Sequence, residues 1–388
     1  MKNIRDILFE ILRASVFGTD AREKFREAKF SQEELEALYQ LASAHDLAHI
    51  VGFALEKNES IKAHPIAKKI ERIYLLSVFR RERQNYEYAR IQAEFEKEKI
   101  PYLPLKGILL CAKYPEAFLR TSTDIDVLVK EEDMPRAETL LRERLSYKKE
   151  DIPAFHDVSL HSPGGIHLEL HFTIKEQMES MDRVLGAVWD NAHPLREGSS
   201  EYRMTEEYFC FHQIAHAAYH FIRGGCGIRP FLDLYLLQKE KSFDESKLSV
   251  LLKEAKLDSF WSAAAELAEV WFGKGKHSEI TRQMESYLLG GGLFGTIENR
   301  VAMGQSQRKG KVRYAFRRIF MPYQSLSRYY PGLKKRPILY PLYQFRRWLR
   351  ILFGKNRDFA VQELMQNADL DQTKVDRASL LRKKLGLE

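Results

Sequence analysis

Apolar residues recur at helical spacing through the first hundred residues of the chain. One such run begins with a capping-box pattern, in which Ser31 is followed three residues later by Glu34. Its apolar positions then recur at helical spacing: Leu35, Leu38, Tyr39, Leu41 and Ala42. A second helical period covers residues 73–100 and has a heavily charged outer face. We therefore predict a helical N-terminal region over residues 1–99.

The hydrophobic period changes after the first hundred residues. Residues 124–129 alternate with period two, which predicts a strand. Two further alternating runs, 156–161 and 166–172, are separated by a Pro-Gly-Gly turn, which is typical of a β-hairpin. Residues 100–175 are therefore expected to form a small mixed α/β unit.

Helical spacing returns after residue 176 and continues to Leu289, where a run of glycines is typical of a helix stop. These glycines follow a helix, so they do not form the strand-bound loop of a dinucleotide site. We divide the rest of the chain into a helical domain over 176–299, a basic aromatic segment over 300–357 and a C-terminal helical tail over 358–388. The predicted fold class is α+β, with a small mixed β-sheet embedded in a mostly helical chain.

Composition narrows the class of protein. The 388 residues are 44% apolar, which is enough for two or three domains with sizeable cores. The three cysteines lie far apart in the sequence, which argues against a disulfide framework or a zinc knuckle. The N-terminal stretch interrupts its apolar positions with charges and is typical of an amphipathic helix, not of a signal peptide. A cytoplasmic protein is the expectation.

The net charge of +8 conceals an uneven distribution. Residues 300–357 contain sixteen Lys or Arg and no Asp or Glu, and the remainder carries a net charge of −8. Aromatic residues are interleaved with these charges. Three interpretations stay open: the segment packs on the acidic body, it binds an anionic membrane surface through residues 308–357, or, least favoured, it binds nucleic acid.

The strongest candidate for chemistry is a set of three carboxylates. Asp124 and Asp126 lie two residues apart on a predicted strand, so their side chains share one face. Glu169 lies on the polar face of the second hairpin strand, together with His167 and His171. If the two strands are neighbours, three carboxylates converge. Like charges held so close require a cation, and Mg²⁺ is the usual one when a substrate supplies phosphates.

Each candidate also has a structural interpretation. An acidic pair at the start of a strand is often a solvated sheet edge, although the third carboxylate argues against that here. His212, His216 and His220 share one helix face, and without a following Glu they are typical of packed polar positions more than of a zinc site. They could also line a substrate cleft, with Arg229 and Asp233 nearby in the sequence.

Several short motifs carry a resemblance to a known family. Pro104-Leu-Lys-Gly107, Tyr114-Pro115, the stretch from Arg120 to Val129 and Leu168-Glu-Leu-His171 resemble the uncharacterised nucleotidyltransferase family, within the DNA-polymerase-β-like superfamily. The likeness extends to features near residues 329–350, over nearly the whole chain. It implies a nucleotidyltransferase core over 100–175.

The resemblance also implies roles for individual residues. Asp124 and Asp126 match the metal-binding aspartate pair, Glu169 the third carboxylate, and Gly107 the glycine of the phosphate-contacting helix start. The pair Lys106-Gly107 replaces the usual Gly-Ser or Gly-Gly of the superfamily. Lys106 then adds a positive charge beside the phosphates, or is simply a solvated lysine.

Two further residues are candidates for nucleotide binding. Arg120 either clamps a phosphate or forms a structural ion pair. His171 either reaches a phosphate or holds Glu169 in place.

The implied activity is transfer of a nucleoside monophosphate group from a nucleoside triphosphate, most commonly ATP, to a hydroxyl acceptor, with Mg²⁺ or Mn²⁺ as cofactor and release of pyrophosphate. The acceptor is unidentified. Bacterial relatives of the family that lie beside surface-polysaccharide genes favour a glycan-linked one. The alternative is a non-catalytic nucleotide-binding or regulatory module. Such a module would dock on a partner, or peripherally on the inner face of a membrane, through the basic segment.

Overall fold

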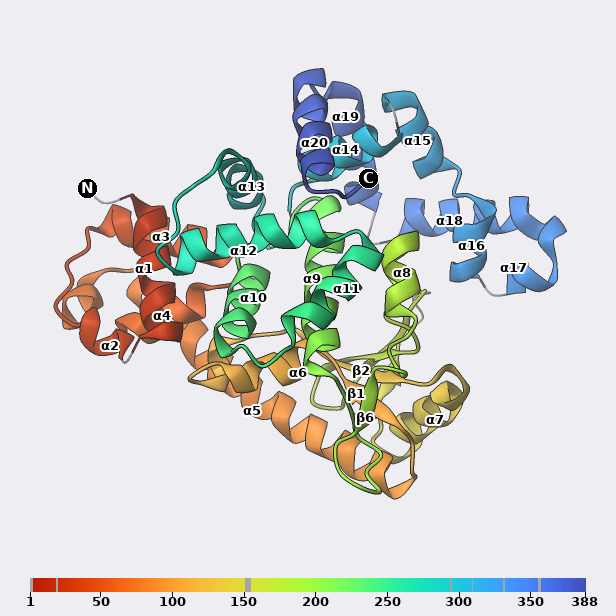
Figure 1. Ribbon diagram of the computed structural model, residues 1–388, viewed down its shortest axis with the longest axis horizontal. Helices are drawn as coiled ribbons and strands as arrows, with labels where there is room; N and C mark the ends of the chain where they lie inside the picture. The colour runs from red at the N-terminus through yellow and green to blue at the C-terminus, as the bar shows by residue number, and fades with distance from the viewer. Residues whose placement is uncertain are drawn as a thin grey trace.

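Helices dominate the structure, a computed structural model that describes residues 3–18, 20–150, 155–293, 295–308, 310–330, 332–354 and 357–388 (Figure 1). They account for 66% of the chain, and the strands form one mixed five-stranded sheet and one two-stranded sheet. This confirms the predicted α+β class.

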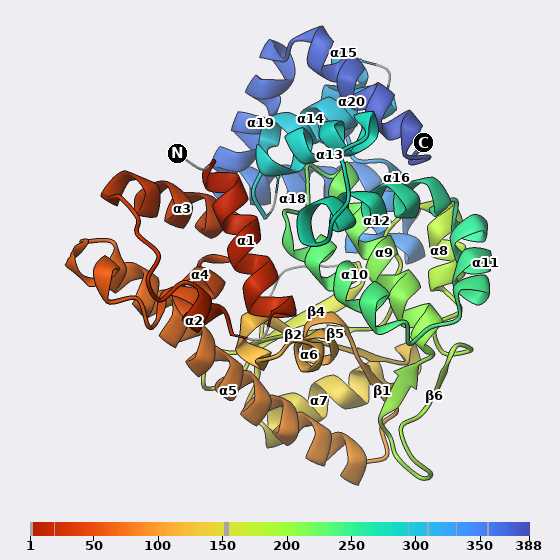
Figure 2. The same ribbon diagram turned by 60° about the vertical axis from the view of Figure 1, so that its left-hand side comes forward.

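The N-terminal region is helical, as the apolar spacing predicts. It consists of α1 (Ile4–Phe17), α2 (Ala21–Lys24), α3 (Gln32–Ala44), α4 (Ala48–Leu55), the short 3₁₀ helix η1 (Glu59–Ala63) and α5 (Ala67–Lys97). The predicted capping box is present at the start of α3, where the Ser31 side chain accepts from the Glu34 backbone N–H and Glu34 accepts from the Ser31 N–H. Figure 2 shows α1 to α4 clustered on one side of the molecule, with α5 running from them past the sheet.

The central sheet has the strand order β1-β2-β5-β4-β3. Its strands are β1 (Tyr102–Pro104), β2 (Asp124–Val129), β3 (Lys148–Lys149), β4 (Asp157–His161) and β5 (His167–His171). Neighbouring strands are antiparallel except β2 and β5, which are parallel. The predicted strand over 124–129 and the predicted hairpin are both confirmed. Gly165 adopts a φ of 77° in the hairpin turn, a conformation that favours glycine.

One face of this sheet is buried against two helices. The apolar side chains of β2 and β5 pack in one cluster with residues of α5 and of α7 (Met134–Arg144). The polar loop before β2 is fixed by the same long helix: Arg81 of α5 donates to the Arg120 carbonyl at 2.8 Å, and Gln84 donates to the Ser122 carbonyl at 3.1 Å. Helix α5 therefore supports the sheet and also positions the chain that enters β2.

A second, two-stranded sheet interrupts the region that was expected to be entirely helical. It pairs β6 (Ala192–Pro194) with β7 (Tyr202–Met204), and strands of three residues are too short to show a period of two. The residues just before β7 pack on the outer edge of β1, where the Tyr102 N–H donates to the Ser200 carbonyl at 2.9 Å. At the opposite edge, β3 exposes Lys148 and Lys149.

The helices after the sheet form the body that faces its polar side. They are α8 (Glu179–Leu185), α9 (Glu206–Ile222), α10 (Arg229–Glu240), α11 (Glu245–Ala255), α12 (Asp258–Phe272) and α13 (Glu279–Leu289). A buried ion pair joins this body to the α/β unit: the Arg120 guanidinium donates to both carboxylate oxygens of Asp233, at 3.0 to 3.2 Å. The Tyr114 hydroxyl donates to the same carboxylate at 2.7 Å.

The basic segment and the tail form the last group of helices. They are α14 (Ile297–Arg308), α15 (Lys311–Ile319), α16 (Tyr323–Tyr329), α17 (Gly332–Lys335), α18 (Tyr340–Phe353), α19 (Arg357–Asp369) and α20 (Gln372–Lys384). Helices α19 and α20, which cover the predicted helical tail, contact α14. Helices α16 to α18 share a small apolar cluster of their own around Leu326, Tyr330 and Leu333, and they project from the body in Figure 1.

Short 3₁₀ helices complete the chain: η2 (Cys111–Lys113), η3 (Ala117–Leu119), η4 (Glu131–Asp133) and η5 (Pro337–Leu339). A five-residue helix, α6 (Lys106–Leu110), follows β1 directly. Within the described ranges, every helix is too short or too polar to span a lipid bilayer.

The Asp233→Asn variant should lose about 3 kcal/mol of unfolding free energy, because it leaves the Arg120 charge buried without a carboxylate. The half-exposed pair of Lys113 and Glu240 gives a matched control, and Glu240→Gln should cost less than about 1 kcal/mol. Urea denaturation of both variants measures the difference. Equal losses would contradict a structural role for the buried pair.

Burial of His45 should make stability depend on pH. It is fully buried, and burial lowers its pKa to about 4, so the native state excludes a proton that the unfolded chain accepts below about pH 6.5. Its contribution is complete above pH 6.5 and is lost as the pH falls toward 4. The His45→Phe variant removes the imidazole. Its unfolding free energy should therefore fall less steeply with decreasing pH, by about 1.4 kcal/mol per pH unit. Urea denaturation at several pH values tests this, and the same decline in both proteins would contradict it. His193→Gln, at an exposed position, is the control.

Candidate active site

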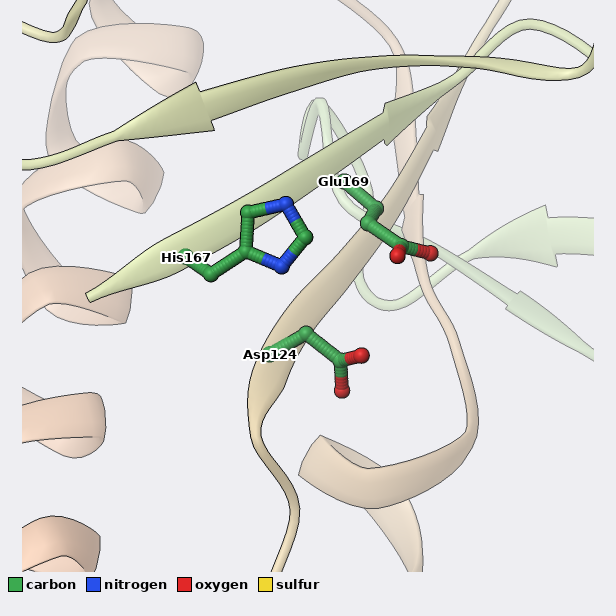
Figure 3. A group of neighbouring side chains, drawn as sticks. All are labelled: Asp124, His167 and Glu169. Atoms are coloured by element: carbon green, nitrogen blue, oxygen red, sulfur yellow. The ribbon is translucent and has the colours of Figure 1, made fainter. Parts of the chain in front are cut away.

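Three carboxylates converge on the polar face of the sheet. The parallel register pairs Asp124 with His167 and Asp126 with Glu169, so that both aspartates and the glutamate project from adjacent strands to the same side. Figure 3 shows Asp124, His167 and Glu169 extending from neighbouring strands into one space. The sequence argument required the two strands to be neighbours, and β2 and β5 are indeed adjacent.

Two cationic groups compensate the charge of Asp126, which is 5% exposed. The Lys106 ammonium lies 3.3 Å from its Oδ1, and His171 Nε2 lies 2.9 Å from the same oxygen. Burial alone would raise the pKa of Asp126, but these two neighbours hold it well below its ordinary value. His171 also lies 3.4 Å from Glu169 Oε2. Although burial opposes it, bonding to both carboxylates raises the pKa of His171 to about 9, so the ring is a cation at neutral pH.

Asp124 is left with uncompensated negative neighbours. Burial and the charges of Asp126 and Glu169 raise its pKa to about 6. Burial would lower the pKa of Lys106, but the surrounding carboxylates, above all Asp126, raise it instead. The cluster thus holds more negative than positive charge, which is the electrostatic condition for attracting a further cation.

The donor atoms form two overlapping groups, each compact enough to hold a metal ion. One contains Asp124, His167 and Glu169, and the other contains Asp126, Glu169 and His171, with donor atoms within 4.8 Å of one another in each. Carboxylate oxygens fit Mg²⁺ and Mn²⁺. Because Glu169 belongs to both groups, it could bridge two positions. His167 was recognised in the sequence as a face neighbour but not as a candidate ligand.

Lys106 and Gly107 lie where the chain turns from β1 into α6. Lys106 adopts a φ of 38°, an unusual backbone conformation for a residue with a side chain. A Cβ at position 107 would lie 3.1 Å from Ser122 Oγ, closer than most such contacts, so glycine lets this turn lie against the loop before β2 without displacing Ser122. Both residues line the cavity described below.

Arg120 is held by structural partners. Besides its bonds to Asp233, its guanidinium donates to the Thr121 carbonyl at 2.9 Å. Burial would lower the pKa of Arg120, but the Asp233 carboxylate raises it. Arg120 therefore forms the structural ion pair that was one of its two interpretations, and it also borders the cavity. His171 contacts both Asp126 and Glu169, as expected of a residue that holds these carboxylates in place.

A cavity of about 390 Å³ opens above the carboxylates, within the size range of small-molecule sites. Its opposite wall contains three histidines of α9, His212, His216 and His220. His212 is buried, as predicted for a packed polar position, but all three face the cavity. Glu176 approaches His216 Nδ1 at 3.0 Å. Burial, with the charge of Lys106 adding to it, lowers the pKa of His212 to about 3, so that ring is neutral.

Other cavity residues could not be chosen from the sequence. Asp46 has a φ of 55° and accepts from Arg229 at 2.7 Å and from Thr121 at 3.0 Å. It lies 78 residues before Asp124, and a lone acidic residue after a helix gives no signal. Glu176 lies in a loop with no periodic pattern. His156, at the start of β4, lines the same cavity.

The comparisons agree with this geometry over most of the chain. Residues 31–273 match the family described as uncharacterised nucleotidyltransferase. The match is shorter than the sequence motifs near 329–350 suggest, and it leaves the basic segment and the tail outside. No curated protein and no solved structure matches. Because the match covers well over half of the 388 residues and includes the carboxylate cluster, the chain belongs to this nucleotidyltransferase family.

Proposed function

We propose that the protein is a metal-dependent enzyme that transfers a nucleoside monophosphate group from a nucleoside triphosphate to a hydroxyl acceptor and releases pyrophosphate. The observation that carries the proposal is the parallel register that places Asp124, Asp126 and Glu169 on one face of the sheet. Family membership supports the general reaction. The cofactor would be Mg²⁺, or Mn²⁺ in its place, and ATP is the commonest donor of the class.

Each carboxylate has a distinct role in the proposal. Asp124 and Asp126 would hold both metal ions, and Glu169 would complete the site on the acceptor side and help to accept the hydroxyl proton. When bound, the ions would supply Lewis-acid stabilisation for an in-line displacement at the α-phosphorus. His171 keeps Asp126 and Glu169 oriented through its two contacts.

The cationic wall of the cavity would hold the triphosphate. Lys106 lies beside Asp126, and its ammonium can contact a phosphate oxygen once metal ions take over the neutralisation of that carboxylate. Gly107, at the start of α6, lines the same cavity and would present its backbone to a phosphate. Arg120, committed to Asp233, would act by fixing the loop that enters β2 beside the triphosphate, not by a direct bond.

The acceptor would enter from the histidine wall. Burial lowers the pKa of both His216 and His220 well below the ordinary value. Neutral imidazoles accept hydrogen bonds from hydroxyl groups. A hydroxyl-bearing acceptor, glycan-linked or otherwise, fits this wall better than an anionic one that would have to face Glu176.

Calorimetric titration with each nucleoside triphosphate tests the site without requiring the acceptor. Wild-type protein should bind one of them in the presence of Mg²⁺ and lose the binding in chelator. The Asp124→Asn/Asp126→Asn variant should bind at least about a hundredfold more weakly, since it removes two anionic ligands from each metal ion.

A matched control is available at the other end of the same strand. Glu131→Gln/Glu132→Gln removes two exposed acidic groups just after β2 and should leave the affinity unchanged. Binding that survives both chelator and the aspartate variant would refute the proposed metal site. Metal-dependent binding without pyrophosphate release, across a panel of hydroxyl acceptors, would favour the non-catalytic module.

Lys106→Gln should separate the two roles of the lysine. Removing the ammonium that competes for Asp126 should strengthen Mg²⁺ binding in the absence of nucleotide. Loss of a charged phosphate contact should weaken binding of the triphosphate about tenfold. Calorimetry with Mg²⁺ alone and then with nucleotide measures both effects. Lys175→Gln, an exposed lysine at the same cavity, is the control, and equal effects at both positions would contradict a specific role for Lys106.

A further inference from the structure

Helix α18 carries its apolar side chains on the solvent side. Five of them are 40% to 86% exposed: Leu342, Phe345, Leu349, Leu352 and Phe353. At about 100° per residue they fall within one arc of the helix surface. The inward face instead buries Gln344 and Arg347, whose side chains donate to backbone carbonyls of residues 318, 319 and 321. The helix is therefore amphipathic with its apolar stripe outward, the reverse of a helix that packs on its own core.

Helix α15 extends the same surface. Val312, Phe316, Ile319 and Phe320 are all more than 40% exposed and lie at helical spacing. Phe316 contacts Phe320 with ring centroids 5.0 Å apart, and Phe320 contacts Trp348 of α18 at 5.4 Å. We call the exposed apolar residues of α15 and α18, together with Trp348, the apolar patch.

Positive charge surrounds the apolar patch. Arg346 and Arg350 are exposed beside the α18 stripe, and residues 300–357 contain no Asp or Glu. Within the described residues of this segment, Arg318 alone forms a salt bridge, with Glu363 of α19. Tyr314 of the segment packs in the main core, but apart from the Arg318 pair the positive charge of the described segment is not neutralised by salt bridges. It is available to an external anion.

We propose that α15 and α18 dock the protein on the surface of an anionic lipid bilayer. The proposal does not depend on the enzymatic function. An apolar arc flanked by arginines is the pattern of a helix that lies in the interface plane, with apolar side chains in the acyl region and cations at lipid phosphates. At about 21 Å, the 14-residue α18 has the length of an interfacial helix and not of a spanning one.

The observations favour a bilayer over nucleic acid or a protein. Nucleic acid binding would use the aromatic rings and arginines but would leave Leu342, Leu349 and Leu352 facing water. A protein groove would need an acidic rim to match sixteen basic residues in the segment. An anionic bilayer satisfies the apolar and the cationic parts with one surface.

Docking would place the cavity beside the membrane. Tyr329 of α16 contacts Phe155 with ring centroids 6.3 Å apart, and Phe155 contacts His156, which lines the cavity. Helix α16, which shares an apolar cluster with α18, therefore connects the docking helices to the cavity.

Vesicle flotation tests the proposal with the full chain. Protein should float with vesicles of phosphatidylcholine containing about 30% phosphatidylglycerol and should remain at the bottom with pure phosphatidylcholine. Raising NaCl to about 1 M should reduce the partition coefficient at least tenfold, since the Debye length falls to about 3 Å. Equal binding to both vesicles, or none to either, would overturn the proposal. So would tight binding to RNA or duplex DNA with no vesicle binding.

Matched triple variants separate the apolar patch from general surface hydrophobicity. Phe345→Ser/Leu349→Ser/Leu352→Ser should reduce the partition coefficient at least tenfold. The same residue types are exposed on α5, at the far lower edge of the molecule in Figure 1, so Leu75→Ser/Leu76→Ser/Phe79→Ser should leave it unchanged. An equal loss in both would overturn the assignment, provided that circular dichroism shows both variants folded.

The charges have their own control pair. Arg346→Gln/Arg350→Gln should weaken binding to anionic vesicles about tenfold, and Lys68→Gln/Lys69→Gln on α5 should have no such effect. Brominated lipids should quench Trp348, so the Trp348→Phe variant should lose most of the quenching. Quenching that persists in that variant would place a different surface on the membrane. The Asp124→Asn/Asp126→Asn variant should dock normally, which distinguishes failure of this proposal from failure of the enzymatic one.

Discussion

The parallel pairing of β2 with β5 is the constraint on which the rest of the structure depends. It aligns Asp126 with Glu169 and brings three carboxylates onto a single face of a small sheet. Such a concentration of charge is unfavourable unless it is compensated. Lys106 and His171 supply two cations directly, and the unbalanced remainder raises the pKa of Asp124 to about 6, with burial as the larger cause. The opposite face has the reverse character, because its apolar side chains pack on α5 and α7.

The surrounding helices hold the strands that carry the carboxylates in place. Helix α5 fixes the loop that enters β2 through Arg81 and Gln84. The ion pair of Arg120 and Asp233 then fixes the same loop against α10, so that the helical body closes over the polar face and forms the cavity. The residues next to the carboxylates thus position the chain, and the carboxylates themselves line the cavity.

The sequence predicted the elements that have strong local signals. Strand β2 was placed correctly because its alternation continues for six residues, and the capping box at Ser31 fixed the start of α3. The hairpin of β6 and β7 was missed because each strand has only three residues and its stability comes from packing near β1. For the site, periodicity placed the three carboxylates on one face. It could not decide the role of Arg120, since its partner Asp233 lies 113 residues away. It could not find Asp46 or Glu176, which reach the cavity only through tertiary packing.

The two edges of the central sheet have a consequence for how this protein can associate with others. At one edge, residues of the segment before β7 already take up the backbone of Tyr102. At the other, β3 is only two residues long and presents Lys148 and Lys149. Short, lysine-rich edges resist the addition of a foreign strand. The sheet therefore offers little free backbone for β-augmentation or for edge-to-edge self-assembly, and recognition of other molecules falls to side chains, in the cavity and on the helices.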